Sequence, residues 1–121
     1  FSSRRRHTRF RNVTGVQTCA LPILNGGPQF PHSEAISFQI PCKDQNEIDK
    51  YWELLTKDGG QESQCGWLKD KFGVSWQVTS PEMMKYLGGS DPDGAKRATD
   101  AMLKMKKIDL ATMKLAYEGT N

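Results

Sequence analysis

Side chains that commonly carry out acid–base or metal chemistry are sparse in this sequence. His32 stands alone in a loop flanked by proline, without the carboxylate pair that would orient a general base. Cys42 and Cys65 lie far apart and outside any Cys-x-x-Cys pair, so their spacing indicates neither a zinc site nor a disulfide framework. We therefore expect reduced thiols in a cytoplasmic protein, no metal ligands and no cofactor, and the sequence identifies no catalytic residue.

Small polar residues alternate with apolar ones in two segments, 35–41 and 74–79, and this spacing predicts two strands. The apolar set is Ile36, Phe38, Ile40, Val74, Trp76 and Val78, and the polar set is Ser37, Gln39, Ser75 and Gln77. A helix over one side of such a sheet would bury the apolar set and leave the polar set on the opposite side. That polar face either meets water or lines a cleft, and the pattern alone leaves both interpretations open.

The elements that would position these strands have clear boundary signals. Asp44 followed by Glu47 is an Asp form of the capping box, so a helix is predicted to begin there and to end at Gly59-Gly60. Residues 61–67 are weakly extended, and residues 70–73 are a turn candidate.

Three more helices are predicted after the second strand. Pro81 suits the first turn of a short helix ending at Gly88-Gly89, and Asp91 caps a longer helix through Met105. A final helix carries Leu110 to Tyr117. The order of strand, helix, further strands and then helices predicts an α+β fold.

The amino-acid composition limits the classes of partner that the protein can bind. The chain has 121 residues with 17 basic and 14 acidic side chains, and no apolar run approaches the length of a membrane span. Five of the arginines lie in residues 1–23, which contain no acid. Without them, 12 basic and 14 acidic residues remain, a net charge of −2. We expect neither a nucleic-acid partner nor a membrane partner.

Residues 1–23 differ from the rest in being Arg-rich and without apolar periodicity. A transit peptide or a basic nucleic-acid arm would fit this composition, whereas a secretory signal would need a longer apolar run. Val13 to Ile23 also corresponds, codon by codon, to the translation of a sequencing-library adapter. We interpret residues 1–23 as a non-native, disordered segment and expect the native chain to be truncated at its N-terminus.

Five segments together resemble the PhnB-like branch of the vicinal oxygen chelate superfamily, which includes glyoxalases and bleomycin-resistance proteins. They are residues 24–28, 35–38, 47–55, 65–77 and 101–109. Many members of this branch are named 3-demethylubiquinone-9 3-methyltransferase. The sequence shows no Gly-rich strand-to-helix turn of the kind that binds S-adenosylmethionine.

The resemblance implies paired βαβββ modules whose curved sheets enclose a cleft. Residues 24–34 would then be the end of a first module and a linker, and residues 35–121 a second module with C-terminal helices. Ala35 would stand at a first-strand metal-ligand position and Gln77 at the position of a last-strand Glu. Alanine binds no metal and an amide is a weak ligand. A divalent metal would therefore need residues of the missing half.

The resemblance also favours a ligand cleft over a solvated face. Its predicted lining is Asn25, Ser37, Gln39, Cys65, Trp67, Ser75 and Gln77. We expect a small-molecule-binding protein without strong metal catalysis. The alternatives are a metal-dependent lyase or isomerase of the glyoxalase type, or the methyl transfer that the family name describes.

A partial sheet would expose an edge, so we expect the fragment to dimerise or aggregate and the full-length protein to be a homodimer.

Overall fold

The computed structural model describes residues 26–120. The chain divides into two units, Phe1–Pro31 and His32–Asn121. In the described part of the first unit, the Phe30 amide donates to the Gly27 carbonyl at 3.2 Å and closes a turn. The interpretations of residues 1–23 and of Asn25 concern positions outside the described residues. The sheet and the helices lie in the second unit.

A mixed four-stranded sheet forms the centre of this unit. Its strands are β1 (Ser37–Pro41), β2 (Gln61–Glu62), β3 (Trp67–Lys69) and β4 (Ser75–Thr79), in the spatial order β1-β4-β3-β2. β1 runs parallel to β4, and the other two pairings are antiparallel. Helix α2 (Gln45–Thr56) provides the crossover between β1 and β2. The predicted α+β class is confirmed.

Helix α2 begins where the capping signal predicts. Asp44 accepts a hydrogen bond from the Glu47 amide at 2.9 Å, and Glu47 accepts one from the Lys43 amide at 2.8 Å. The predicted end at Gly59-Gly60 is wrong, because the helix ends at Thr56 and a 3₁₀ turn, η1 (Lys57–Gly59), follows. Lys57 takes an extended conformation, and this interrupts the helix before the glycines.

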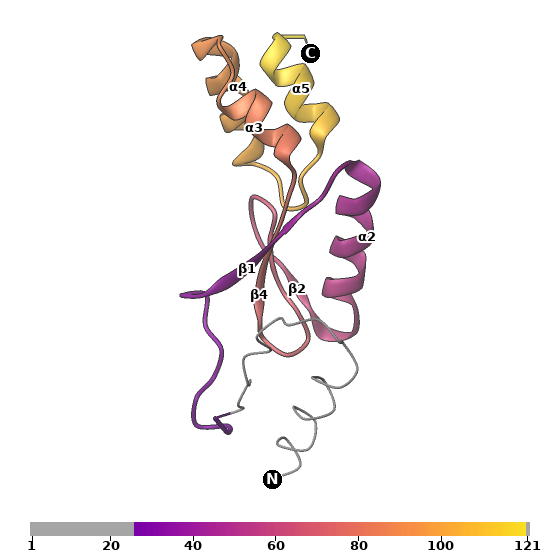
Figure 1. Ribbon diagram of the computed structural model, residues 1–121, viewed down its shortest axis with the longest axis vertical. Coiled ribbons are helices and arrows are strands. Elements are labelled where there is room, and N and C mark those ends of the chain that lie inside the picture. Colours follow the sequence, from indigo (N-terminus) through magenta and orange to yellow (C-terminus); the bar gives the residue numbers. More distant parts are fainter. Residues whose placement is uncertain (1–25, 121) are drawn as a thin grey trace, which may run out of the picture. The chain divides into compact units, whose positions relative to one another are not determined.

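The apolar side of the sheet packs under α2, which lies along it in Figure 1 and contacts mainly β3 and β4. Ile48 and Trp52 of the helix meet Leu68 and Val78 of the sheet in one buried cluster. Trp76, opposite Leu68 and Phe38 in the register, packs against this cluster and is partly buried.

Two residues predicted to be buried are exposed. Ile36 is 75% exposed and Phe38 is 56% exposed. β1 is an edge strand, whereas α2 contacts mainly β3 and β4, so α2 does not cover the side chains at the start of β1. Phe38 packs instead on the Trp76 ring, with 5.2 Å between the ring centroids.

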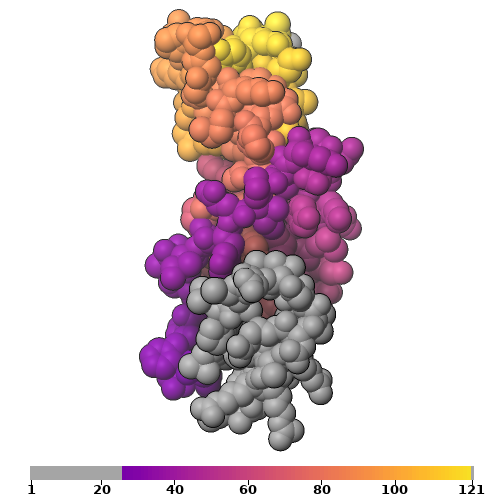
Figure 2. Space-filling view, viewed as in Figure 1, coloured from indigo at the N-terminus to yellow at the C-terminus, as the bar shows by residue number. Residues whose placement is uncertain are grey.

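Three helices follow the sheet and pack on one another (Figure 1). They are α3 (Pro81–Leu87), α4 (Pro92–Met102) and α5 (Leu110–Glu118). Figure 2 shows them as a packed group of orange and yellow atoms. The prediction that α4 continues to Met105 is wrong. Hydrogen bonds from the Lys104 and Met105 amides to carbonyls three residues earlier tighten the chain into turns after Met102.

Gln45 ties the segment between α4 and α5 to the start of α2. Its amide nitrogen donates to the Ile108 carbonyl at 2.9 Å, and its amide oxygen accepts from the Leu110 backbone at 2.9 Å. Lys107 adds an ion pair to Asp49 at 2.8 Å. Ile108, Leu110 and Met113 are buried in the same cluster as Ile48, so the helices and the sheet share a core.

No helix within residues 26–120 combines the length and the apolar character needed to cross a membrane.

The predicted turn at residues 70–73 is present and is organised by one carboxylate. Asp70 accepts hydrogen bonds from the Phe72 and Val74 amides at 2.9 and 3.0 Å and from the Trp76 indole at 2.9 Å. Burial pulls the pKa of Asp70 upward, but the hydrogen bonds from Trp76, Val74 and Phe72 together outweigh it, so its pKa lies below the usual value.

The lowered pKa of Asp70 predicts a loss of stability in acid. A carboxyl whose pKa is lower in the folded state stabilises that state above its unfolded pKa of about 3.9. This contribution disappears as the pH falls through the folded pKa. Urea unfolding at pH 7 and at about pH 3 measures how much the free energy of unfolding falls in acid. We expect this fall to be smaller for Asp70→Asn than for the parent chain. Equal differences in the two proteins would contradict the prediction.

Candidate functional site

The side of the sheet opposite α2 carries a hydrogen-bonded polar cluster centred on Gln77. The Gln77 amide nitrogen donates to the Ser37 hydroxyl at 2.8 Å, and the Gln77 amide oxygen accepts from the Gln39 amide at 3.3 Å. Gln39 and Gln77 are cross-strand partners, and Ser37 is paired with Ser75. β1 and β4 therefore present one continuous polar surface, with Gln77 held in place from both ends of its amide.

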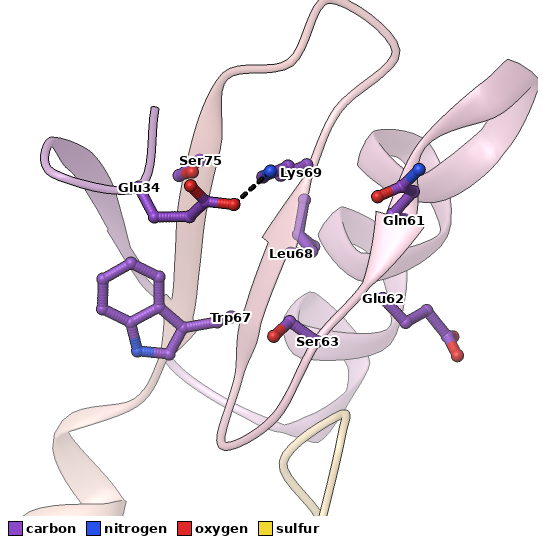
Figure 3. Close-up of a pocket in the computed structure, with 8 residues that line it drawn as sticks. All are labelled: Glu34, Gln61, Glu62, Ser63, Trp67, Leu68, Lys69 and Ser75. Atoms are coloured by element: carbon purple, nitrogen blue, oxygen red, sulfur yellow. Dashed lines mark ion pairs between the residues drawn. The ribbon is translucent and has the colours of Figure 1, made fainter. Parts of the chain in front are cut away.

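Strand β3 extends this surface. Trp67 stands opposite Gln77, and Lys69 stands opposite Ser75, so both side chains lie on the same side of the sheet as the polar cluster. Figure 3 shows Trp67, Lys69 and Ser75 gathered around Glu34, which comes from the segment before β1. A cavity of about 150 Å³ opens here. Its lining is Glu34, Gln61, Glu62, Ser63, Trp67, Leu68, Lys69 and Ser75.

Two features of this cavity concern charge and hydrogen bonding. Lys69 forms an ion pair with Glu34, whose pKa is lowered by the hydrogen bond from the ammonium group. Ser75 is only 2% exposed, and its hydroxyl has no hydrogen-bond partner among the described residues. Buried hydroxyl groups are normally paired, so Ser75 is an exception that calls for an explanation.

Glu62 does not add negative charge to the polar face. It pairs with Leu68 across β2 and β3, on the side that faces α2. Its carboxylate accepts a hydrogen bond from the Trp52 indole of that helix at 2.8 Å. Glu34 is therefore the carboxylate that reaches Lys69 in the described chain.

The structure brings five of the seven predicted cleft residues onto one face, namely Ser37, Gln39, Trp67, Ser75 and Gln77. It places Cys65 elsewhere, in the turn between β2 and β3, with its thiol donating to the Met102 carbonyl at 3.6 Å. Asn25 lies outside the described residues. That the five residues bind a ligand remains a prediction.

Sequence reasoning missed Glu34 and Lys69. Lys69 could have been found from its position two residues after Trp67, since alternate residues of a strand share a face. Glu34 precedes β1 and has no periodic signal. Glu34 lies close to Lys69 only in the folded chain, although β4 separates β1 from β3 in the sheet (Figure 3).

Metal ligands do not gather on this face. Within residues 26–120, no group of three or more His, Cys, Asp or Glu side chains is arranged to hold a metal ion. The polar groups of the face are amides, hydroxyls, the Lys69 ammonium group and the Glu34 carboxylate paired with it, which suit hydrogen bonding to an organic molecule.

Comparison with protein families finds a match over the sheet and α2. Residues 6–79 match the family model of 3-demethylubiquinone-9 3-methyltransferase. The matched range contains β1, α2 and strands β2 to β4 with the whole polar face, and it ends before α3. It also begins inside residues 1–23, and the interpretation of that segment as adapter-derived remains a prediction. No curated protein matches the chain. Because the matched range is more than half of the sequence, the chain belongs to the 3-demethylubiquinone-9 3-methyltransferase family, a glyoxalase-like family.

Proposed function

We propose that this chain is a PhnB-like vicinal oxygen chelate protein that binds a small molecule on the polar face of its sheet, without strong metal catalysis. The unit formed by β1, α2, β2, β3 and β4 is, in this proposal, the βαβββ module of that superfamily. The observation that carries the proposal is the fixed cluster of Ser37, Gln39 and Gln77 beside the Trp67 ring. Aromatic walls with a few fixed polar groups are typical of small-molecule sites.

The position of Gln77 supports a binding role over a structural one. Its side chain is partly buried on the side of the sheet away from α2, and its partners are the two side chains of the edge strand β1. Hydrogen bonds at a half-exposed surface contribute little to folding, because water replaces them. The same groups, held in one orientation, can direct a ligand at low entropic cost.

Gln77→Ala is expected to weaken ligand binding and leave the fold intact. A fragment library of small neutral and charged rings, screened by two-dimensional NMR, should give shift changes at Ser37, Gln39, Trp67 and Gln77. Loss of one or two hydrogen bonds to a bound fragment predicts a decrease in affinity of about 5-fold to 30-fold for Gln77→Ala.

The matched control is Gln64→Ala, in the exposed turn between β2 and β3. It should leave both affinity and melting temperature unchanged. If no fragment shifts residues of the polar face, the proposed function is wrong.

Metal titration separates this proposal from the enzyme alternatives. A lyase or isomerase of the glyoxalase type would bind Ni²⁺, Zn²⁺ or Mn²⁺ stoichiometrically, and calorimetry on the full chain would detect it. We expect no stoichiometric binding, because Ala35 supplies no ligand and Gln77 only a neutral oxygen. Tight binding of one ion per chain would favour the enzyme. Tight binding of S-adenosylmethionine would favour the methyl transfer named by the family.

A further inference from the structure

The cavity beside Trp67 carries an internal ion pair that a ligand could replace. This inference rests on the proposed function and concerns the chemistry of the ligand. Lys69 projects from the last position of β3, opposite Ser75, whereas Glu34 reaches it from the segment before β1. The Glu34 side chain is 61% exposed and that of Lys69 is 35% exposed. Exposed ion pairs contribute little stability, so Glu34 can leave Lys69 at small cost.

Ser75 lies directly across the strand pair from Lys69. Its hydroxyl is buried in the cavity lining and has no hydrogen-bond partner among the described residues, although a hydroxyl can both donate and accept. A ligand oxygen between Lys69 and Ser75 could accept a hydrogen bond from each. The Glu34 carboxylate satisfies only the lysine in the present arrangement.

The size of the cavity limits the ligand. A dry cavity of about 150 Å³ in another protein accepts a molecule as large as benzene, and the volume here is about 150 Å³. Trp67 provides one flat wall (Figure 3), and Gln61 and Ser63 provide polar groups at the β2 side. A single ring, or an aliphatic group of similar bulk, fits this space.

We propose that the cavity binds a small monocarboxylate, whose carboxylate displaces Glu34 from Lys69 and accepts a hydrogen bond from the Ser75 hydroxyl while its body lies against Trp67. Glu34 thus acts as an internal stand-in for the ligand. It neutralises Lys69 in the free protein and competes with the ligand for the same ammonium group. A competing internal carboxylate lowers the apparent affinity by the fraction of molecules in which it occupies the lysine.

Calorimetry and two-dimensional NMR on the full chain at pH 7 test this with benzoate as the probe. Benzamide is the neutral control of equal size, and inorganic phosphate is the anion without a ring. We expect benzoate to bind about 10-fold or more tightly than benzamide, with shift changes at Trp67, Lys69 and Ser75. Charge-assisted hydrogen bonds are roughly twice as strong as neutral ones, which sets this ratio.

The variants give opposite effects. Glu34→Gln removes the competitor and should tighten benzoate binding about 3-fold to 10-fold, whereas a merely structural ion pair would give no gain. Lys69→Gln should weaken it about 10-fold or more, and Ser75→Ala about 3-fold to 10-fold. Glu53→Gln on α2 and Lys85→Gln on α3 are exposed controls that change the net charge as Glu34→Gln and Lys69→Gln do, respectively, and they should leave binding unchanged. If Lys69→Gln does not fold, Glu34→Gln and Ser75→Ala still decide the result.

Each outcome separates the two proposals. Equal binding of benzoate and benzamide, or no effect of Glu34→Gln, overturns the carboxylate proposal while leaving a small-molecule site in place. Phosphate binding as tightly as benzoate also overturns it, because the site would then select charge without a ring. Absence of binding by every fragment, charged or neutral, overturns the proposed function itself.

Discussion

Replacing Trp76 by alanine is expected to lower the free energy of unfolding by about 3–5 kcal/mol, the range for removing a large aromatic side chain from a core. Trp76 packs against the buried cluster that contains Trp52 and Leu68, and its ring lies 5.2 Å from that of Phe38. Its indole also donates to Asp70, which organises the turn between β3 and β4. Urea unfolding of the parent and the variant measures the difference.

Two controls identify the origin of this loss. Trp76→Phe keeps most of the apolar area but removes the hydrogen bond to Asp70, so it should cost clearly less than alanine. Gln77→Ala, one residue further along β4 and on the opposite face, should change stability by less than about 1 kcal/mol. A tolerated Trp76→Ala together with an unfolded Gln77→Ala would mean that the faces are exchanged, since a shift of one residue in register exchanges every side chain.

Replacing Gly66 by alanine is expected to destabilise the protein by on the order of 3 kcal/mol. Gly66 has φ of +83°, a conformation that costs other residues roughly 1–3 kcal/mol. A Cβ atom there would lie 2.8 Å from the Val78 carbonyl oxygen and 3.1 Å from Ile108. The backbone of Gly66 also hydrogen-bonds to Val78 and to Lys106, at 2.8 Å in each case. Any shift that relieves the clash would strain both bonds, each worth about 1 kcal/mol.

Gly73 provides a matched control for this prediction. Its φ of +84° is almost the same, but an added Cβ would meet only the Cβ of His32, at 4.0 Å. Gly73→Ala should therefore show the backbone cost alone. The difference between the two variants in melting temperature and in urea midpoint measures the steric contribution at Gly66. Equal effects of the two substitutions would show that the close approach to Val78 is not important.

The local elements of this protein follow from short-range signals in its sequence. Asp44 with Glu47, Pro81 and Asp91 mark the starts of three helices, as the sequence predicts. At Asp44 and Asp91 a side-chain oxygen satisfies an amide that the first turn leaves unpaired, and the structure adds Ser80 as the cap before Pro81. The alternation in residues 35–41 and 74–79 predicted both long strands, and it also separated Gln77 from Trp76. These signals depend on neighbours within four positions along the chain, so they can be read without a structure.

Helix ends were less predictable. α2 ends before the two glycines, and α4 ends before Met105, because the ends depend on how the following segment connects to the rest of the fold. In α4 this segment is held by Gln45, which is distant in sequence.

Tertiary structure alone decided which parts of the sheet are covered and which side chains meet on the open face. The position of α2 over β3 and β4 leaves Phe38 exposed, although its sequence pattern is that of a core residue. The ion pair of Glu34 with Lys69 and the hydrogen bond of Cys65 to Met102 each join residues that have no periodic relation. That the Ser75 hydroxyl is buried without a hydrogen-bond partner among residues 26–120 is likewise a result of the packing. Sequence periodicity specifies the face on which a side chain lies, but the neighbours across that face are set by how distant segments pack, and this depends on the shape and burial of the whole unit.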